Sequence, residues 1–241
     1  ESINLQMFNS FLDGSKSAIE MTAVCNATGL IPQDAGLQFP SASRFELADI
    51  CKPSSDGGVL TRSGTTEVVS SLTRAGETVA HHLAMGTFVV IQAGSDYARQ
   101  CLREYHMLPD KTGQYGALYR PTHMIGLELG VSIASVALRG EPTGQPMCFS
   151  SDVVAIAKRD LKIGELLDGE GGHCVFGRQM PSEKSLSART VPLGLSAGMR
   201  LVRNVASGQM LCRDDVDVGT PDEATLARDE MVSAFAPPKI P

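Results

Sequence analysis

The sequence of 241 residues has no tryptophan, only four tyrosines and no excess of basic residues. Its formal net charge is −6 at pH 7, and its pI is about 5.4. Nucleic acids and anionic membrane surfaces are bound through basic patches, so this composition argues against both as partners. The best candidate for a membrane helix, residues 124–138, falls short of the roughly 20 apolar residues that such a helix needs and contains Glu128.

Common catalytic and nucleotide-binding motifs are missing as well. There is no Walker loop, no HExxH and no GxSxG, and no GxGxxG follows a predicted strand. The glycine-rich stretch GEGGHCVFG, residues 169–177, lacks the third glycine of a dinucleotide fingerprint, so we predict no cofactor-binding residues in this chain. The six cysteines are scattered without a CxxC pair, which is typical of free thiols in a reducing compartment and predicts a cytoplasmic protein.

The apolar content of 42% is enough for a real core, in one large domain or two smaller ones. Local patterns predict a strand at 4–12, a helix at about 14–27, a buried strand at 87–93, a helix at 95–108 and a helix at 122–139. The last of these is almost wholly apolar, which is typical of a buried helix. Its exceptions form one narrow polar stripe of Glu128, Ser132, Ser135 and Arg139.

After GEPTGQP, residues 140–146, the pattern changes to short strands with glycine turns. The stretches RDLKIGELL, from Arg159, and RNVASGQML, from Arg203, share an arginine, a glycine five residues later and then Glu or Gln. Such a repeat predicts a small β domain built from two similar turns. We therefore predict an α+β fold. It consists of a mixed sheet with helices on one face at 1–150, a mostly β module at 151–220 and a C-terminal tail at 221–241.

A first candidate site lies in the stretch FLDGSK, where Lys16 falls in the first turn of a predicted helix. A helix N-terminus carries about half a positive charge, so a lysine is disfavoured there unless a carboxylate or a bound anion compensates it. Lys16 is a solvated lysine, a partner of Asp13, or a functional ammonium beside an anionic or carbonyl substrate. Asp13 is by default the N-cap of the helix, and Glu20 lies one turn beyond Lys16 on the same face.

A second candidate cluster is YRPTHMIGLE, which contains Arg120, His123 and Glu128. A carboxylate within an apolar helix must be paired, hydrated or protonated, so Glu128 has either a structural basic partner or a role in binding. Arg120 is well placed as an anion clamp before a helix N-terminus, although arginines are common there for structural reasons. His123 does not share a helix face with Glu128, and the two converge only if the helix borders a cleft.

Three stretches, FLDGSKSAIEMTAVCNATGL, YRPTHMIGLELGVSIASVALRGEPTG and AKRDLKIGELLDGEGGHCVFG, resemble the downstream part of 1-deoxy-D-xylulose 5-phosphate reductoisomerase-like proteins. These are oxidoreductases related to homoserine dehydrogenase that end in a SAF domain of the β-clip type. The resemblance covers most of residues 1–220. It implies a catalytic α+β domain followed by a SAF-like module, and it places the Rossmann domain that binds NAD or NADP outside this chain.

The function implied by the resemblance is that of the catalytic and SAF portion of an NAD(P)-dependent oxidoreductase, or oxidoisomerase, acting on a branched sugar acid or sugar phosphate. The resemblance assigns catalysis to Lys16, Asp13 and Glu20, and substrate binding to Arg120, His123 and Glu128. The resemblance also allows a divalent metal, and it implies a homo-oligomer such as a dimer. Because the Rossmann domain lies outside this chain, we expect the chain alone to be inactive. Two alternatives stay open: a SAF-type carbohydrate-binding or assembly module without chemistry, and a sugar-acid dehydratase-like lyase.

Overall fold

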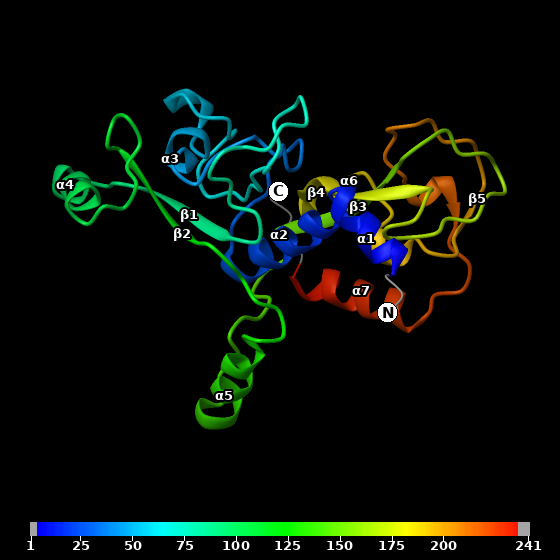
Figure 1. Cartoon of the computed structure of the whole chain (residues 1–241). Helices are drawn as coiled ribbons and strands as arrows, with labels where there is room; N and C mark the ends of the chain where they lie inside the picture. The colour runs from blue at the N-terminus through cyan, green and yellow to red at the C-terminus, as the bar shows by residue number, and fades with distance from the viewer. Residues whose placement is uncertain (1–3, 236–241) are drawn as a thin grey trace, which may run out of the picture. The chain divides into compact units, whose positions relative to one another are not determined.

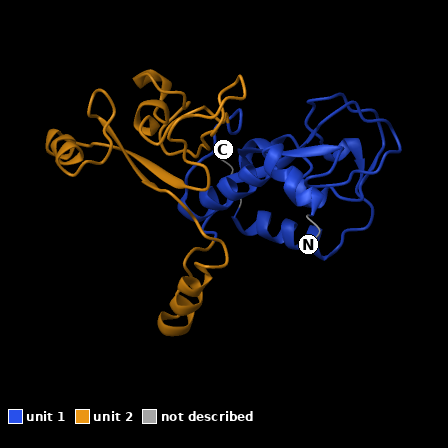
Figure 2. Cartoon of the chain, in the orientation of Figure 1, with its two compact units in different colours: residues 1–37, 146–241 blue, residues 38–145 orange. Residues whose placement is uncertain are grey.

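The computed structural model describes residues 4–235 and has an α+β fold, as predicted. The chain forms two compact units, which Figure 2 shows in different colours. Unit 1 combines residues 1–37 with residues 146–241, and unit 2 comprises residues 38–145. The boundary predicted near residue 150 lies close to the point where the chain re-enters unit 1. Among residues 4–235, no helix combines the length and the apolar character needed to cross a membrane.

Unit 1 begins with helix α1, Leu5–Leu12 (Figure 1), so the strand predicted at 4–12 is wrong. Asn4 caps this helix, because its side-chain oxygen accepts the Met7 N–H at 3.1 Å. The cap satisfies a donor that the first turn of any helix leaves free. The apolar residues Leu5, Phe8 and Leu12 also recur at spacings of three and four, which is typical of a helix and not of a strand.

Helix α2, Ser15–Thr28, confirms the helix predicted at about 14–27. It ends at Gly29, whose φ of 76° is left-handed and costs a glycine little. The helix packs on an antiparallel pair formed by β3, Ser151–Ala157, and β4, Val175–Pro181. This packing is the reason why residues near the N-terminus belong to one unit with the β module, although the sequence assigned them to the preceding domain.

The two similar stretches, from which a small β domain of two similar turns was predicted, pair with each other in the structure. Leu161 and Val205 exchange backbone hydrogen bonds of 2.8 and 3.0 Å. The turn glycines Gly164 and Gly208 are both left-handed, and each donates its N–H at 2.8 Å to the strand that precedes the other stretch. A local two-fold arrangement therefore surrounds one apolar core, whose larger members are Leu161, Leu167, Val175, Val191, Leu193, Leu201, Val205 and Leu211.

The rest of the β module consists of short elements: α6 at Ser182–Ser187, β5 at Arg200–Leu201, β6 at Val216–Asp217 and the single turns η2 at Leu193–Leu195 and η3 at Arg213–Asp215. No helix within residues 153–218 is longer than the six residues of α6. The prediction that this range holds no helix longer than three turns is therefore confirmed.

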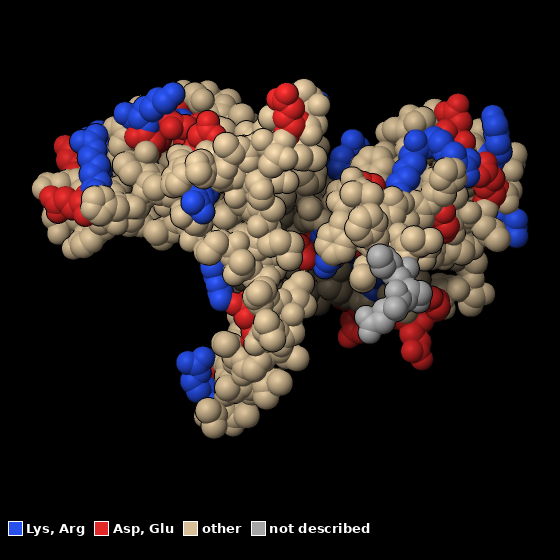
Figure 3. Space-filling view, in the orientation of Figure 1, with Lys and Arg blue, Asp and Glu red and all other residues tan. Residues whose placement is uncertain are grey.

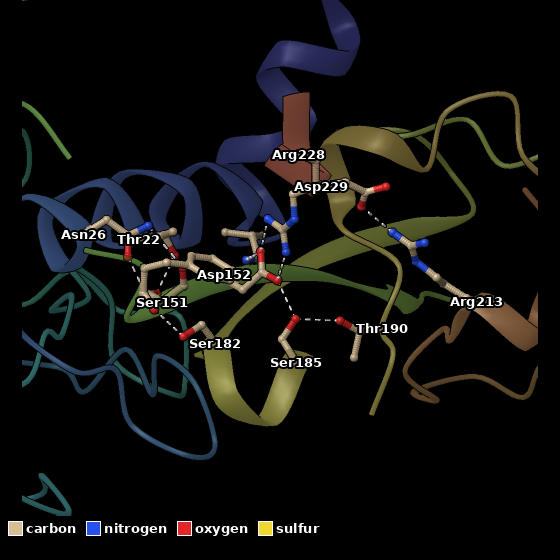
Figure 4. A network of polar contacts seen from close by, with 12 residues as sticks. Thr22, Asn26, Ser151, Asp152, Ser182, Ser185, Thr190, Arg213, Arg228 and Asp229 are labelled. Atoms are coloured by element: carbon tan, nitrogen blue, oxygen red, sulfur yellow. Dashed lines mark hydrogen bonds and ion pairs between the residues drawn. The ribbon is translucent and has the colours of Figure 1, made fainter. Parts of the chain in front are cut away.

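Helix α7, Glu223–Phe235, occupies the predicted tail, and residues 236–241 lie outside the described part of the chain. Figure 4 shows how α7 is attached to β3. Arg228 donates to the two carboxylate oxygens of the buried Asp152, at 3.1 and 2.5 Å, and the Ser185 hydroxyl donates to the same carboxylate. The described part of the tail is therefore docked through a buried ion pair.

Unit 2 is built around the antiparallel pair of β1, Thr87–Gln92, and β2, Tyr115–Arg120 (Figure 1). All strands of residues 4–235 pair as two-stranded antiparallel sheets, so the mixed sheet predicted for the first part is not observed there. The strand predicted at 87–93 is confirmed, but its burial is not: Val89 is 50% exposed, because only one face of the pair packs on the core of unit 2.

Two further helices of unit 2 are short. Helix α3, Leu47–Ile50, contributes two buried residues to the core, and η1, Ser54–Asp56, follows it as a single turn. Helix α4, Asp96–Glu104, lies within the predicted helix at 95–108, and the side chain of Ser95 caps it by accepting the Ala98 N–H at 3.1 Å.

Helix α5, Leu129–Arg139, is shorter than the helix predicted at 122–139. Gly126 has a φ of 86°, a left-handed conformation that does not continue a helix, so α5 begins only after it. The predicted burial is also wrong: Leu127, Val131 and Leu138 are 80, 67 and 83% exposed.

Candidate functional site

An open pocket of about 370 Å³ lies in unit 1, where α1, the turn before α2, the end of β3 and a glycine loop meet. The glycine loop comprises residues 169–173. The residues that line the pocket are Asn9, Leu12, Asp13, Lys158, Arg159, Gly172 and His173. The pocket thus joins the first and the third of the stretches that carry the family resemblance.

The turn between α1 and α2 positions Asp13 at this pocket. Gly14, with a φ of 83°, is the N-cap of α2, whereas the sequence predicted Asp13 in that place. Asp13 still satisfies a helix donor, because its Oδ1 accepts the Ser15 N–H at 2.9 Å. The Ser15 hydroxyl in turn accepts the Gly177 N–H at 2.7 Å, which ties the start of α2 to β4.

Asp13 forms an ion pair with Lys158, a residue that the sequence did not identify as part of the site. The Lys158 Nζ lies 2.6 Å from the Asp13 Oδ2, and the two side chains are 19 and 13% exposed. The same ammonium donates to the Gly172 carbonyl at 2.5 Å. Lys158 follows directly after β3, so the rigid β pair holds the charged group at the wall of the pocket.

The glycine loop is held by α1 and by its own carboxylate. Asn9 donates its side-chain amide to the Gly171 carbonyl at 2.8 Å. The Asp168 carboxylate accepts the N–H groups of His173 and of Cys174, the latter at 3.0 Å. Burial alone would raise the pKa of Asp168, but these hydrogen bonds outweigh burial and lower it below its ordinary value.

The same loop does not fit the pyrophosphate of a dinucleotide. A phosphate cradle presents free N–H groups and open space beside its glycines. Here the N–H groups that follow the glycines bind Asp168, and the space beside Gly171 and Gly172 is filled by Gln6 and Asp168. We therefore assign none of these residues to a dinucleotide.

Lys16 is not among the residues that line the pocket. Its ammonium lies 3.0 Å from the Glu20 carboxylate, and the side chains of this pair are 31 and 40% exposed. Of the roles considered from the sequence, pairing with Asp13 is not observed, and the partner of Lys16 is Glu20. Asp13 instead binds Lys158, which is far away in sequence and whose only signal was its place in the third resembling stretch.

Arg120, His123 and Glu128 all lie in unit 2. Arg120 forms an ion pair with Glu128, so the structural partner expected for that carboxylate is present. Glu128 also accepts the Met124 N–H at 3.1 Å. His123 instead donates a ring N–H to the Met85 carbonyl at 2.7 Å. The structure thus brings two of the three predicted substrate-binding residues together and ties the third to a different loop.

Arg159 is a second cation beside the pocket, but it is paired. Its guanidinium lies 2.8 Å from the Glu165 carboxylate, and this hydrogen bond lowers the pKa of Glu165. Within the described residues, no group of three or more His, Cys, Asp or Glu side chains is placed to hold a metal ion. We therefore assign no metal ligand, and the pocket chemistry rests on Asp13 and Lys158.

A family model described as "Oxidoreductase DRL, catalytic domain" matches residues 1–129, which is more than half of the chain. The matched part includes the Asp13 turn and the strands of unit 2, whereas Lys158 and the glycine loop lie beyond it. No curated protein matches this chain.

Proposed function

The chain belongs to the family of the oxidoreductase DRL catalytic domain, and on this premise we propose that it is the catalytic and SAF-like portion of an NAD(P)-dependent oxidoreductase. The proposed substrate is a branched sugar acid or sugar phosphate whose reacting hydroxyl binds beside Asp13 and Lys158. Membership of the family supports the oxidoreductase role. The cofactor and the substrate class rest on the resemblance of the three stretches.

The observation that carries this proposal is the pair of Asp13 and Lys158. Their charged groups are 2.6 Å apart, mostly buried, and still part of the wall of an open pocket. An ammonium has three N–H groups; one donates to the Gly172 carbonyl, and a second is directed to the Asp13 carboxylate in the proposed site, where the ion pair brings the two charged groups together. The third is free to bind a substrate oxygen in the pocket.

This geometry suits proton transfer at a hydroxyl or carbonyl group. Oxidation of an alcohol to a ketone removes the hydroxyl proton, and the reverse reduction returns a proton to the carbonyl oxygen. We assign the donation and removal of this proton to Lys158, and the orientation of Lys158 to Asp13. Lys16, in the first turn of α2, is proposed to bind the anionic group of the substrate together with the helix N-terminus, and Glu20, its observed partner, to position Lys16.

The cofactor is proposed to bind to a segment outside this chain, since the glycine loop described above is filled by the chain itself. When bound, NAD(P) supplies the hydride chemistry. Arg120, His123 and Glu128 stay predicted substrate-binding residues, and their observed partners lie within unit 2.

The test is a comparison of turnover in the full-length gene product with NAD(P) and a panel of sugar acids and sugar phosphates. We expect K158M to lower kcat by a factor on the order of 10²–10⁴, as loss of a proton-transfer group does. K158R should not restore it, because a guanidinium stays charged and does not exchange a proton. K16A is expected mainly to raise KM, because Lys16 is proposed to bind the anionic group of the substrate.

The matched control is K184M. Lys184 also pairs with an aspartate, Asp34, at 2.9 Å, but both side chains are more than half exposed and neither lines the pocket. K184M should leave kcat and KM unchanged. If K158M keeps near-normal turnover, the assignment of the site is wrong. If the wild-type protein binds the sugar but turns over none of the panel, a binding module without chemistry is the better interpretation.

A further inference from the structure

One cation of unit 2, Arg44, lies against aromatic rings instead of a carboxylate. Its guanidinium carbon is 5.0 Å from the centre of the Phe45 ring and 5.6 Å from that of the Tyr119 ring. Both distances are within the roughly 6 Å over which the face of a ring attracts a cation. Many other basic side chains lie beside acidic ones, as the blue and red atoms on the visible face of Figure 3 show. Arg44, in contrast, forms no ion pair within residues 4–235.

The terminal nitrogens of this guanidinium are open to solvent. Within the described residues, Nε is the only side-chain nitrogen of Arg44 that is both buried and without a hydrogen bond. Nη1 and Nη2 have no hydrogen-bond partner there either, and because they are not buried, solvent can reach them. These two nitrogens form the planar end of the fork that binds two oxygens of one phosphate or carboxylate. The rings on which the fork lies orient it in advance, so little side-chain freedom is lost when an anion binds.

An exposed ring surface adjoins the fork. The Phe45 side chain is 49% exposed, and its ring meets the exposed His81 ring edge to face, with centroids 5.4 Å apart and 68° between the planes. The backbone fixes this arrangement, because the Arg44 N–H donates to the His81 carbonyl at 3.0 Å. An exposed aromatic ring beside a cation can bind a flat ligand by stacking while the cation binds an anionic group.

The charged neighbours of Arg44 leave this position open to an anion. Glu46 is close in sequence, but its carboxylate accepts the Ser43 N–H at 3.0 Å and does not pair with the guanidinium. Arg120 follows Tyr119 in β2, and successive side chains of a strand point to opposite faces, so Arg120 belongs to the other face. The Arg44 position is therefore separate from the predicted substrate-binding cluster that contains Arg120.

We propose that Arg44, Phe45 and His81 form a binding site on unit 2 for a phosphorylated ring compound. The Arg44 fork binds two oxygens of the phosphoryl group, and the ring of the ligand stacks on Phe45. A phosphoryl group suits the site better than a carboxylate, because it brings up to about two negative charges to a cation that no local carboxylate neutralises. Nucleotides and cyclic sugar phosphates share this chemistry. The site does not depend on the proposed function, since it contains neither Asp13 nor Lys158.

A nucleic-acid strand is not the proposed ligand. Such strands are bound through many phosphate contacts along a basic groove. The formal net charge of this chain is −6, and the basic side chains on the visible face of Figure 3 are scattered. A single fork beside one exposed ring fits one phosphoryl group of a small molecule.

The test is calorimetric titration of the purified chain with phenyl phosphate and with inorganic phosphate. The wild-type chain should bind phenyl phosphate more tightly by a factor on the order of 2–10, because only phenyl phosphate has a ring to stack. R44M should weaken the binding of both by a factor on the order of 10–100, because charge-assisted hydrogen bonds are lost. R44K should weaken both as well, since an ammonium keeps the charge but not the fork. F45A should remove most of the preference for phenyl phosphate.

The matched control is R74M, which removes the same charge from an exposed arginine of unit 2 for which the described residues provide neither a ring nor a carboxylate. R74M should leave both affinities unchanged, and circular dichroism verifies that each variant is folded. Adenosine 5′-monophosphate and ribose 5-phosphate separate the two sources of ligand, because the one that binds more tightly identifies the class.

Three results overturn the proposal. The first is a wild-type chain that binds neither adenosine 5′-monophosphate nor ribose 5-phosphate. The second is an affinity for phenyl phosphate that R44M leaves unchanged, or that R44K leaves unchanged if R44M does not fold. The third is a loss of affinity in R74M as large as that in R44M, which would mean that the phosphates respond only to the overall charge of unit 2.

Discussion

The apolar core of the β module in unit 1 and the buried charges of unit 2 stabilise their surroundings in different ways. In the β module, Leu161, Leu201 and Leu211 are at most 1% exposed and pack against other buried apolar side chains. In unit 2, a smaller apolar cluster around Leu47 is accompanied by buried charged residues. These are Lys52, Glu67 and Asp110, which are 6, 7 and 5% exposed.

The difference shows that one chain can combine two sources of stability. Burial of apolar surface contributes roughly in proportion to its area and does not depend on pH. A buried ion pair contributes little in net terms, but the loss of one partner leaves an uncompensated charge. Unit 1 also contains buried carboxylates that pair with arginines, Asp152 with Arg228 and Asp215 with Arg203, so a change of a single charge should destabilise the unit that holds the pair. The tyrosines provide a selective probe, because all of them lie in unit 2: Tyr97, Tyr105, Tyr115 and Tyr119.

The largest expected effect follows from removing the buried ammonium of unit 2. Lys52 lies 2.7 Å from the Asp110 carboxylate, and the two side chains are 6 and 0% exposed. K52M keeps the apolar stem but leaves Asp110 without its cation, which should lower the free energy of unfolding of unit 2 by about 3–5 kcal/mol. Urea denaturation followed by tyrosine fluorescence measures this loss. The control is K111M at an exposed position, and an equal loss in both variants contradicts the role of the buried pair.

A somewhat smaller loss is expected from the apolar core of unit 1. L161A removes a buried side chain at the centre of the paired turns and should cost about 2–5 kcal/mol, as such truncations do. The neighbouring I163A is the control, because Ile163 is 64% exposed in the same turn. In urea denaturation, the unfolding transition of unit 1 followed by circular dichroism should shift to lower urea concentration. The transition of unit 2 followed by tyrosine fluorescence should stay at the same urea concentration. A shift of both signals to the same extent means that the two units unfold as one.

Features that depend on local bonds were predictable from the sequence. The helix that became α2 and its end at Gly29 follow from spacing and from a glycine in a left-handed conformation. The similar turns at Gly164 and Gly208 were predictable from the likeness of the stretches RDLKIGELL and RNVASGQML. The helix signal lies within about 15 neighbouring residues, and the repeat compares two stretches of nine residues each, so both can be found in short windows of sequence.

Features that depend on distant partners were not predictable. The composition of α5 indicated a buried helix, but burial depends on a partner that composition does not name. Asp13 was one of the partners considered for Lys16, yet the fold brings Lys158 to Asp13 and leaves Lys16 with Glu20. Local electrostatics thus pointed to a turn that lines a pocket and gave no signal for Lys158, which lines the same pocket.

The smallest expected effect concerns pH and separates the two units once more. The pKa of Asp110 is lowered from an ordinary 3.8 to about 2. Burial acts in the opposite direction, and it is outweighed by the Lys52 ammonium, the Tyr115 N–H and the Thr112 hydroxyl, which all bind the carboxylate. A carboxyl whose pKa is lower in the folded state stabilises that state at pH values above the unfolded pKa. The stabilisation is lost as the pH falls through the folded pKa.

Unit 2 should therefore lose about 2 kcal/mol through Asp110 alone as the pH falls from about 5 towards 2. D110N isolates this contribution, because every other carboxyl group titrates alike in both proteins. The wild-type protein should be the more stable at pH 5, and the difference in unfolding free energy, followed by tyrosine fluorescence, should shrink steadily towards pH 2. A difference that stays constant over this range shows that the buried carboxylate of unit 2 does not titrate as its contacts require. In that case unit 2 resists acid as the apolar core of the β module is expected to.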